Sequence, residues 1–173
     1  MKVVKSVWSW KVSEKCLELT KHYEGMSLSP YLCPADVVTI GYGTVIRDQY
    51  GNALKGEQGM KDAMRWYPEL AKITPADADR FLANLMPIYE GMVMDNLLVK
   101  QEQHQFDALV SHAYNCGISE NLYRLINDNA PLDKITEWFE TKYITAKGKV
   151  LRGLVKRRKS ESILYSSGEL VLY

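Results

Sequence analysis

The stretch from Thr20 to Thr44, TKHYEGMSLSPYLCPADVVTIGYGT, places the strongest limits on how this 173-residue chain folds. A helical pattern ends at Glu24, where Gly25 follows, and the chain then becomes extended and rich in turn residues. The tetrapeptide Cys33-Pro34-Ala35-Asp36 has proline in the second place of a tight turn. Residues 37–46 are mostly β-branched or small, which predicts a β-strand. The stretch therefore predicts a small sheet directly after a helix.

Two features of this stretch suit a catalytic groove. On a strand over residues 37–46, one face carries a single hydroxyl and two residues without a side chain, because side chains alternate between faces. That face consists of Val37, Thr39, Gly41 and Gly43. Glu24 lies in the last turn of the helix, beside the negative end of the helix dipole, where ionisation of a carboxylate is disfavoured. This place suits a general acid, although position alone favours an ordinary solvated glutamate.

The spacing of three residues in this stretch resembles a known catalytic triad. Eight residues separate Glu24 from Cys33 and five separate Cys33 from Thr39. This pattern resembles the phage-type lysozymes, the endolysin family (glycoside hydrolase family 24) that includes the T-even phage lysozymes. Many members carry Asp at the middle position, and a subset carries Cys, often followed by Pro-Ala as here. The sequence TIGYG, which contains Thr39, is a further hallmark of that family.

Three later blocks extend the resemblance in the order found in the family. They are Thr74-Pro75 opening a long helix, Gln105–Val110 leading to Tyr114-Asn115-Cys116-Gly117, and Gly153–Arg158 continuing to Glu161. Together the matched blocks run from about Ser13 to Tyr165, which is most of the chain. Four ordered blocks are far more specific than any single motif.

The resemblance implies an α+β, mostly helical, lysozyme-like fold. In that fold a small N-terminal β-sheet lobe and a helical C-terminal lobe are joined by a long helix, with the active-site cleft between the lobes. The implied organisation is one domain over 1–173. Its parts are an N-terminal lobe at about 13–72, the connecting helix at 73–98, the helical lobe at 99–165 and a tail at 166–173.

The activity implied by the resemblance is that of a muramidase. Such an enzyme hydrolyses the β-1,4 bond between N-acetylmuramic acid and N-acetylglucosamine in bacterial peptidoglycan. Glu24 would be the general acid, and Cys33 and Thr39 would support the attacking water. The Thr39 hydroxyl is too weak an acid to serve as a base, but it can hold water by hydrogen bonding. Two roles stay open for Cys33: a thiolate with a lowered pKa, or a polar spacer.

Substrate contacts are implied for residues outside the triad. They are Tyr42, Asn115, Arg157 and Arg158. The family places a basic residue of the last helix near the catalytic glutamate, and which of the two arginines does so stays open. Asp36 stands where relatives commonly have glycine, and a turn role is expected for it.

The helical segments are predicted from the spacing of their apolar residues and from the residues that begin or end helices. Residues 103–116 form an amphipathic pattern that Gly117 ends, with His104 and His112 off the apolar stripe and hence at expected exposed positions. Thr74 is expected to cap a long helix that Pro87 kinks or divides. Shorter helices are expected at 122–127 and 132–139, and a last one at 154–165.

Charge is unevenly distributed along the chain. Residues 142–159 hold eight Lys or Arg and no acidic residue, so the remainder carries a net charge of −7 against a total of +1. A basic face of this kind can bind nucleic acid, an anionic membrane or the bacterial wall. An ordinary solvated helix is the plainer explanation.

The remaining expectations concern compartment, cofactors and partners. Three cysteines without CxxC spacing argue against a disulfide framework or a zinc site, so no metal or cofactor is expected. Residues 1–16 lack the apolar centre of a secretion signal, and no apolar run of about 18 residues occurs. We therefore expect a monomer in the host cytoplasm until its release to the peptidoglycan of the cell wall, without stable membrane insertion or nucleic acid.

Three other functions compete with muramidase as explanations of the sequence. The first is a catalytically weak or inactive lysozyme-like module that binds the cell wall, and the intact Glu24, Cys33 and Thr39 argue against it. A nucleic-acid binder ranks lower because few aromatic residues accompany the basic segment. A cysteine hydrolase that pairs Cys33 with His104 or His112 has no spacing rule to support it.

Overall fold

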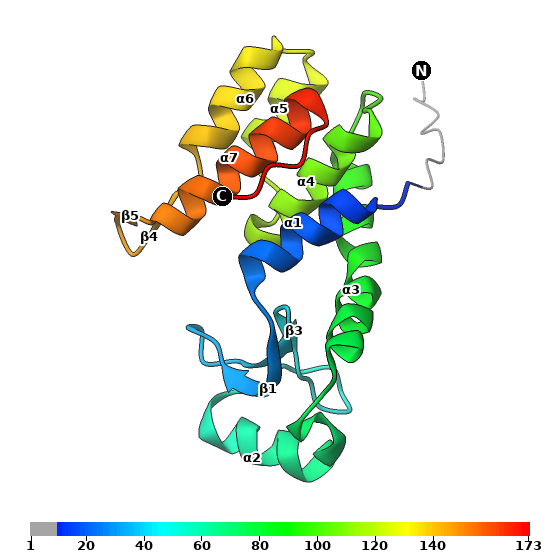
Figure 1. Cartoon of the computed structure of the whole chain (residues 1–173), viewed down its shortest axis with the longest axis vertical. Coiled ribbons are helices and arrows are strands. Elements are labelled where there is room, and N and C mark those ends of the chain that lie inside the picture. The colour runs from blue at the N-terminus through cyan, green and yellow to red at the C-terminus, as the bar shows by residue number, and fades with distance from the viewer. Residues whose placement is uncertain (1–9) are drawn as a thin grey trace. The chain divides into compact units, whose positions relative to one another are not determined.

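The computed structural model describes residues 10–173, which Figure 1 shows as a ribbon. The described part is mostly helical and holds two small antiparallel sheets, which confirms the expected α+β class. It divides into two compact units, Glu24–Leu85 on the one hand and residues 10–23 with 86–173 on the other. The expectation about a secretion signal concerns residues 1–16, of which 1–9 lie outside the described part.

The unit Glu24–Leu85 is built around a three-stranded antiparallel sheet of order β1-β2-β3. Its elements are β1 (Ser27–Leu32), β2 (Val38–Gly41), β3 (Thr44–Val45), α2 (Gly56–Trp66), the 3-10 helix η1 (Pro68–Ala71) and the first part of α3 (Pro75–Asn96). All four residues of β2 are buried: β1 and β3 pair with its two edges, and α2 also packs against it.

The prediction of one strand over residues 37–46 is wrong. The chain turns back at Tyr42-Gly43, so that β2 and β3 pair with Thr39 opposite Val45. Gly41 and Gly43 have φ angles of 65° and 100°, a region that side chains disfavour, so glycine makes this hairpin possible. Gly43 therefore does not belong to the strand face that carries Thr39.

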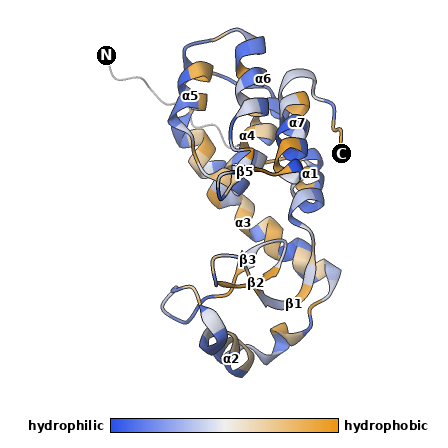
Figure 2. Ribbon diagram, turned by 90° about the vertical axis from the view of Figure 1, so that its left-hand side faces the viewer, coloured by the Kyte–Doolittle hydropathy of each residue, from blue (hydrophilic) through white to orange (hydrophobic). Residues whose placement is uncertain are grey.

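The second unit is a group of helices in which α7 packs against both α4 and α6 (Figure 1). Its elements are α1 (Glu14–Glu24), the second part of α3, α4 (Gln103–Cys116), α5 (Glu120–Asn127), α6 (Leu132–Thr141), β4 (Thr145–Ala146), β5 (Lys149–Val150) and α7 (Arg152–Ser167). Hydrophobic and hydrophilic residues alternate along α5 and α6 in Figure 2, as expected of helices with one buried face.

All of helix α1 except its last residue, Glu24, groups with the C-terminal helices. The backbone amide and hydroxyl of Ser13 both donate to the carboxylate of Asp107 on α4. Cys16 and Leu19 are fully buried, and the hydroxyl of Tyr23 is 2.7 Å from that of Ser160 on α7. These contacts explain why the sheet unit begins only at Glu24.

Helix α4 has the predicted bounds, and Gly117 ends it with a φ of 73°. The expected exposure of His112 is wrong, since its side chain is only 1% exposed. The imidazole ring lies 5.3 Å from the rings of both Trp138 and Tyr143. α4 is covered on more than one side by other elements, so its polar face is buried as well as its apolar stripe.

Helix α3 begins as predicted and continues through its proline. The Thr74 hydroxyl accepts a hydrogen bond from the Asp77 amide and donates one to the Asp77 carboxylate, which caps the helix. Pro87 lies inside the single helix Pro75–Asn96 and does not divide it. α3 contributes residues to both units, and the cleft expected between the lobes stays a prediction.

The basic segment contains a hairpin that was not predicted. Strands β4 and β5 pair around Lys147-Gly148, and α7 starts directly afterwards. Two of the eight cations, Arg157 and Arg158, are buried, so the exposed charge is smaller than the sequence suggests. Among the helices of the described residues, none is long and apolar enough to cross a membrane.

Candidate active site

Glu24 is the last residue of α1, and its side chain is half-buried. Gly25 follows with a φ of 68°, which ends the helix and turns the chain into β1. The C-terminal end of a helix carries partial negative charge, and the Glu24 side chain lies at that end of α1. This is the place predicted for a general acid.

Cys33 begins the tight turn expected from its sequence. The amide of Asp36 donates to the carbonyl of Cys33 at 2.8 Å, with Pro34 in the second place. Asp36 has a φ of 60°, a left-handed conformation that Asp tolerates and glycine favours. The turn role predicted for Asp36 is thus confirmed, and it presents the half-buried Cys33 side chain beside the start of β2.

The surroundings of Cys33 favour its thiolate. A hydrogen bond from the backbone amide of Val37 lowers the pKa of the Cys33 thiol below its ordinary value, with smaller contributions from the Ala35 amide and the Thr39 hydroxyl. Partial desolvation of the sulfur acts in the opposite direction. Amide N–H groups that converge on one atom stabilise negative charge there.

Thr39 lies on the central strand β2 and is 3% exposed. Its hydroxyl donates to the carbonyl of Val37 at 3.0 Å and also lies within hydrogen-bonding reach of Cys33. A hydroxyl has one proton and two lone pairs, so it donates to one acceptor at a time and can still accept from a water. The structure therefore brings Cys33 and Thr39 together, as their spacing predicts.

Tyr31 lies beside the candidate site and was not predicted from the sequence. It lies on β1 directly opposite Thr39, so the two side chains share a face of the sheet, and it is 37% exposed. Desolvation raises the pKa of the Tyr31 phenol, and the negative charges of Cys33 and Glu24 raise it further. The phenol therefore lies within electrostatic reach of both groups. Recognising β1 as the partner of β2 in the sequence would have revealed it.

The remaining predicted site residues fall into two groups. Tyr42 lies in the β2–β3 turn and is 9% exposed, which leaves little of its ring to a ligand. Asn115 is exposed at the end of α4, and its side-chain oxygen accepts from Arg158 at 3.0 Å. Asn115 and Arg158 are therefore brought together, within a unit other than that of Tyr42.

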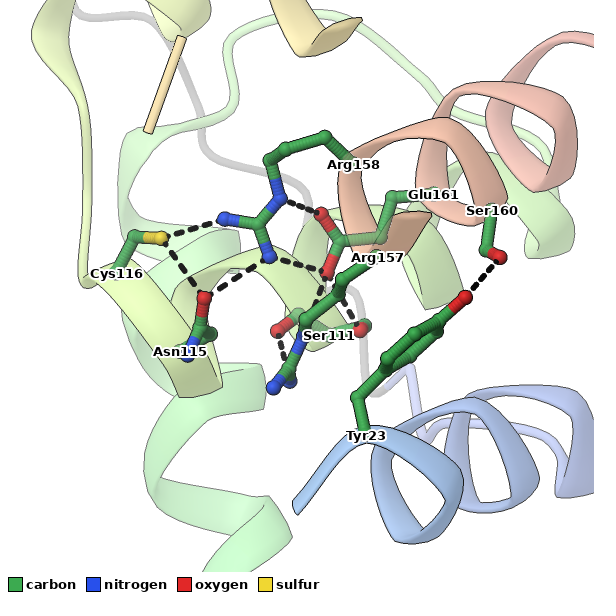
Figure 3. A network of polar contacts seen from close by, with 8 residues as sticks. All are labelled: Tyr23, Ser111, Asn115, Cys116, Arg157, Arg158, Ser160 and Glu161. Atoms are coloured by element: carbon green, nitrogen blue, oxygen red, sulfur yellow. Dashed lines mark hydrogen bonds and ion pairs between the residues drawn. The ribbon is translucent and has the colours of Figure 1, made fainter. Parts of the chain in front are cut away.

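Arg157 and Arg158 belong to a buried ionic network on α7 (Figure 3). The carboxylate of Glu161 pairs with Arg158 at 2.8 Å and with Arg157 at 3.3 Å, and it accepts from the Ser111 hydroxyl at 2.9 Å. Arg158 also donates to the sulfur of Cys116 at 2.6 Å. Because both arginines are almost completely buried, their contacts favour a supporting role over direct contact with a glycan. In the part of the chain from residue 10 onward, no group of His, Cys, Asp or Glu could hold a metal ion.

A family model and individual relatives identify the same group of proteins as similar to this chain. The family model described as phage lysozyme matches residues 21–161. The endolysin of Bacillus phage PZA is 31% identical over 164 residues, which cover 91% of this chain and 56% of that protein. The endolysin of Acyrthosiphon pisum secondary endosymbiont phage 1 is 28% identical over 163 residues, covering 90% of this chain and 98% of that protein.

A solved structure agrees with the sequence match. The endolysin from Escherichia coli O157:H7 phage FAHEc1 superposes with a TM-score of 0.74 at 28% identity, covering 95% of this chain and 98% of that one. The chain thus spans about half of the PZA endolysin but nearly the whole of two other endolysins. Because the family model covers most of its length, the chain belongs to the phage lysozyme family.

Proposed function

We propose that the chain is a muramidase of the endolysin type, a glycosidase that hydrolyses the β-1,4 bond between N-acetylmuramic acid and N-acetylglucosamine in peptidoglycan. Membership of the phage lysozyme family and relatives named as endolysins support this proposal. The observation that carries it is the set of Glu24, Cys33 and Thr39 in one compact unit, with Tyr31 within electrostatic reach of Glu24 and Cys33. As proposed, the protein acts as a monomer on the wall after release from the host cytoplasm.

In the proposed reaction, Glu24 gives its proton to the glycosidic oxygen as the bond from that oxygen to the anomeric carbon breaks. A water molecule attacks the anomeric carbon from the opposite face of the sugar, which inverts its configuration. Thr39 accepts a hydrogen bond from this water while it donates to the Val37 carbonyl. The Cys33 thiolate, which the lowered pKa of the thiol favours, takes the water's other proton.

Residues of the other unit are proposed to act less directly. Asn115 is exposed and would hydrogen-bond to a sugar with its amide group, while Arg158 fixes that side chain from behind. Arg157 would act through Glu161, which it pairs with inside the unit. Tyr42 would support the β2–β3 turn that follows Thr39.

Replacement of Glu24 tests the proposal. Glu24→Gln keeps the shape of the side chain and removes the transferable proton, so wall hydrolysis should fall by roughly 10²- to 10⁴-fold. Glu18→Gln, an exposed position on the same helix, is the matched control and should hydrolyse walls like the parent. The rate of turbidity loss of purified walls measures both, and thermal unfolding checks that both variants fold.

Two outcomes would contradict the proposal in different ways. If Glu24→Gln kept most of the parent rate, the general acid would be another residue. If the parent protein bound walls in a pull-down but never reduced their turbidity or released fragments, the chain would be a wall-binding module that lacks the chemistry.

A further inference from the structure

The β4–β5 hairpin and the start of α7 present a surface that is both basic and apolar, which we call the basic hairpin surface. Its exposed or half-exposed cations are Lys142, Lys147, Lys149, Arg152, Lys156 and Lys159. Its exposed apolar side chains are Tyr143, Val150, Leu151 and Val155. Residues 142–160 contain no acidic side chain, so the cations have no internal counter-charge along this segment.

Three of the exposed apolar residues lie close together along the chain, where the hairpin leads into α7. Val150 ends β5, and Leu151 follows it directly. The Leu151 amide donates to the Ile144 carbonyl at 2.9 Å, which closes the base of the hairpin. The Val155 amide donates to the Leu151 carbonyl at 3.0 Å, so Val155 lies one helical turn further along the same side. Val150, Leu151 and Val155 are 63%, 43% and 36% exposed.

The segment that leads into the hairpin is packed against the helical unit. The Tyr143 ring packs 5.3 Å from His112 and 5.8 Å from Trp138, both of which are buried in the helical unit. The chain is therefore anchored to the core two residues before β4 begins, and the surface needs little ordering before it binds a partner.

We propose that the basic hairpin surface binds an anionic phospholipid bilayer peripherally, with the cations at the headgroups and the aliphatic side chains at the acyl boundary. Both kinds of side chain contribute to binding at a bilayer, because cations interact with the anionic headgroups and apolar groups leave water at the interface. A soluble polyanion would use only the charges and would leave Val150 and Leu151 in water. A single-stranded nucleic acid would need stacking aromatics, and the one available ring, Tyr143, already packs against His112. This binding goes beyond wall hydrolysis and does not depend on it.

Sedimentation with lipid vesicles tests the inference without an activity assay. One set of vesicles is equimolar phosphatidylglycerol and phosphatidylcholine, and the other is phosphatidylcholine alone. The full chain should bind the anionic vesicles and not the neutral ones. Binding should weaken in about 0.5 M salt, because screening shortens the reach of surface charges.

Two variants separate the charged from the apolar contribution. Lys147→Gln with Lys149→Gln and Arg152→Gln should weaken binding roughly 100-fold, at about fivefold for each cation. Val150→Ser with Leu151→Ser should weaken it about tenfold at low and at high salt. The matched control removes three exposed cations of the other unit, Lys61, Arg65 and Lys72, by substitution with Gln and should leave binding nearly unchanged.

Three results would overturn the inference. Equal loss in the control variant would mean that total charge, and not this surface, determines binding. Unchanged binding of the Val150→Ser, Leu151→Ser variant, together with equal binding to soluble polyphosphate, would identify a polyanion site instead of a bilayer site. Failure of the parent protein to bind anionic vesicles at low salt would exclude the surface altogether.

Discussion

At the residue scale, Cys33 carries the most specific chemistry of the site. The amides of Val37 and Ala35 both favour its thiolate, and no cation is needed to explain the lowered pKa. The resemblance implies Asp at this position in many family members, so the thiolate would take the place of a carboxylate. The role of Cys33 is therefore a question of charge at working pH.

A substitution series at Cys33 tests this role. Cys33→Asp should stay within about tenfold of the parent rate, whereas Cys33→Ala and Cys33→Ser should fall by roughly 10²-fold, since neither ionises. Because the thiolate is the active form, the parent rate should fall as pH drops through the thiol pKa. That limb should move to lower pH in the Asp variant. Equal wall hydrolysis by the Cys, Ser and Ala proteins at every pH would make Cys33 a spacer.

His112 is the second residue whose surroundings have a measurable consequence. Burial lowers its pKa to about 4 from an ordinary 6.5, with Arg158 and Arg157 adding to the effect and Glu161 opposing it. The Nε2 atom is buried and has no hydrogen-bond partner within the described part of the chain. The folded protein therefore holds this imidazole neutral in a pH range where the unfolded chain protonates it.

The stability of the protein should depend on pH through His112. Between pH 6.5 and 4 the unfolded state binds the extra proton, so stability should fall as pH drops, by roughly 3 kcal/mol in all. Urea unfolding across this range should show a shallower pH dependence for His112→Phe than for the parent. The exposed His22→Gln is the control and should follow the parent. Identical slopes in parent and His112→Phe would show that His112 does not titrate as inferred.

At the scale of elements, helix α7 contains a network of buried charged side chains. The i, i+3 and i, i+4 spacing of Arg158, Arg157 and Glu161 brings both guanidinium groups to one carboxylate. Such a network adds little over apolar packing, but removal of one partner leaves an uncompensated buried charge. The junction between α4 and α7 should therefore be sensitive to single substitutions.

Arg158→Met should destabilise the protein by about 3–5 kcal/mol, because Glu161 loses its fully buried partner. Arg152→Met, at an exposed position of the same helix, should change the free energy of unfolding by less than about 0.5 kcal/mol. Urea unfolding at neutral pH measures both. A loss below 1 kcal/mol in Arg158→Met would mean that water reaches the network or that Arg157 replaces its partner.

The elements also show what the sequence could and could not predict. The bounds of α4 follow from a 3.6-residue period and a terminal glycine, both local signals. The burial of His112 does not, because it depends on α6 and the segment around Tyr143, which come later in the chain. The turn at Tyr42-Gly43 was not predicted because the β-branched residues on both sides of it suggest one continuous strand. The positive φ angles of Gly41 and Gly43 show where the chain turns.

The candidate site divides in the same way. Glu24, Cys33 and Thr39 could be predicted from the sequence, because their spacing resembles a known catalytic triad. Tyr31 could not be predicted in this way, since it lies opposite Thr39 only because of the register in which β1 and β2 pair. The burial of Arg157 and Arg158 likewise depends on how α7 packs against α4 and on the position of Glu161.

At the scale of the whole molecule, the two units carry different properties. The unit Glu24–Leu85 holds the proposed catalytic set, and the unit of residues 10–23 with 86–173 holds the buried ionic network and the basic hairpin surface. The proposed catalytic set and the proposed binding surface therefore lie in separate parts of one chain. Each can be altered by substitution without touching the other, which allows wall hydrolysis and surface binding to be measured independently.

The central claim is that the chain cleaves peptidoglycan at the reducing side of N-acetylmuramic acid. Analysis of the soluble fragments from purified walls by reduction and mass spectrometry tests it most directly, with Glu24→Gln as the blank. We predict new reducing ends on N-acetylmuramic acid, released by the parent and not by the variant. Reducing ends on N-acetylglucosamine, anhydro-muramic acid products, or new amino groups without new reducing sugars would each contradict the account.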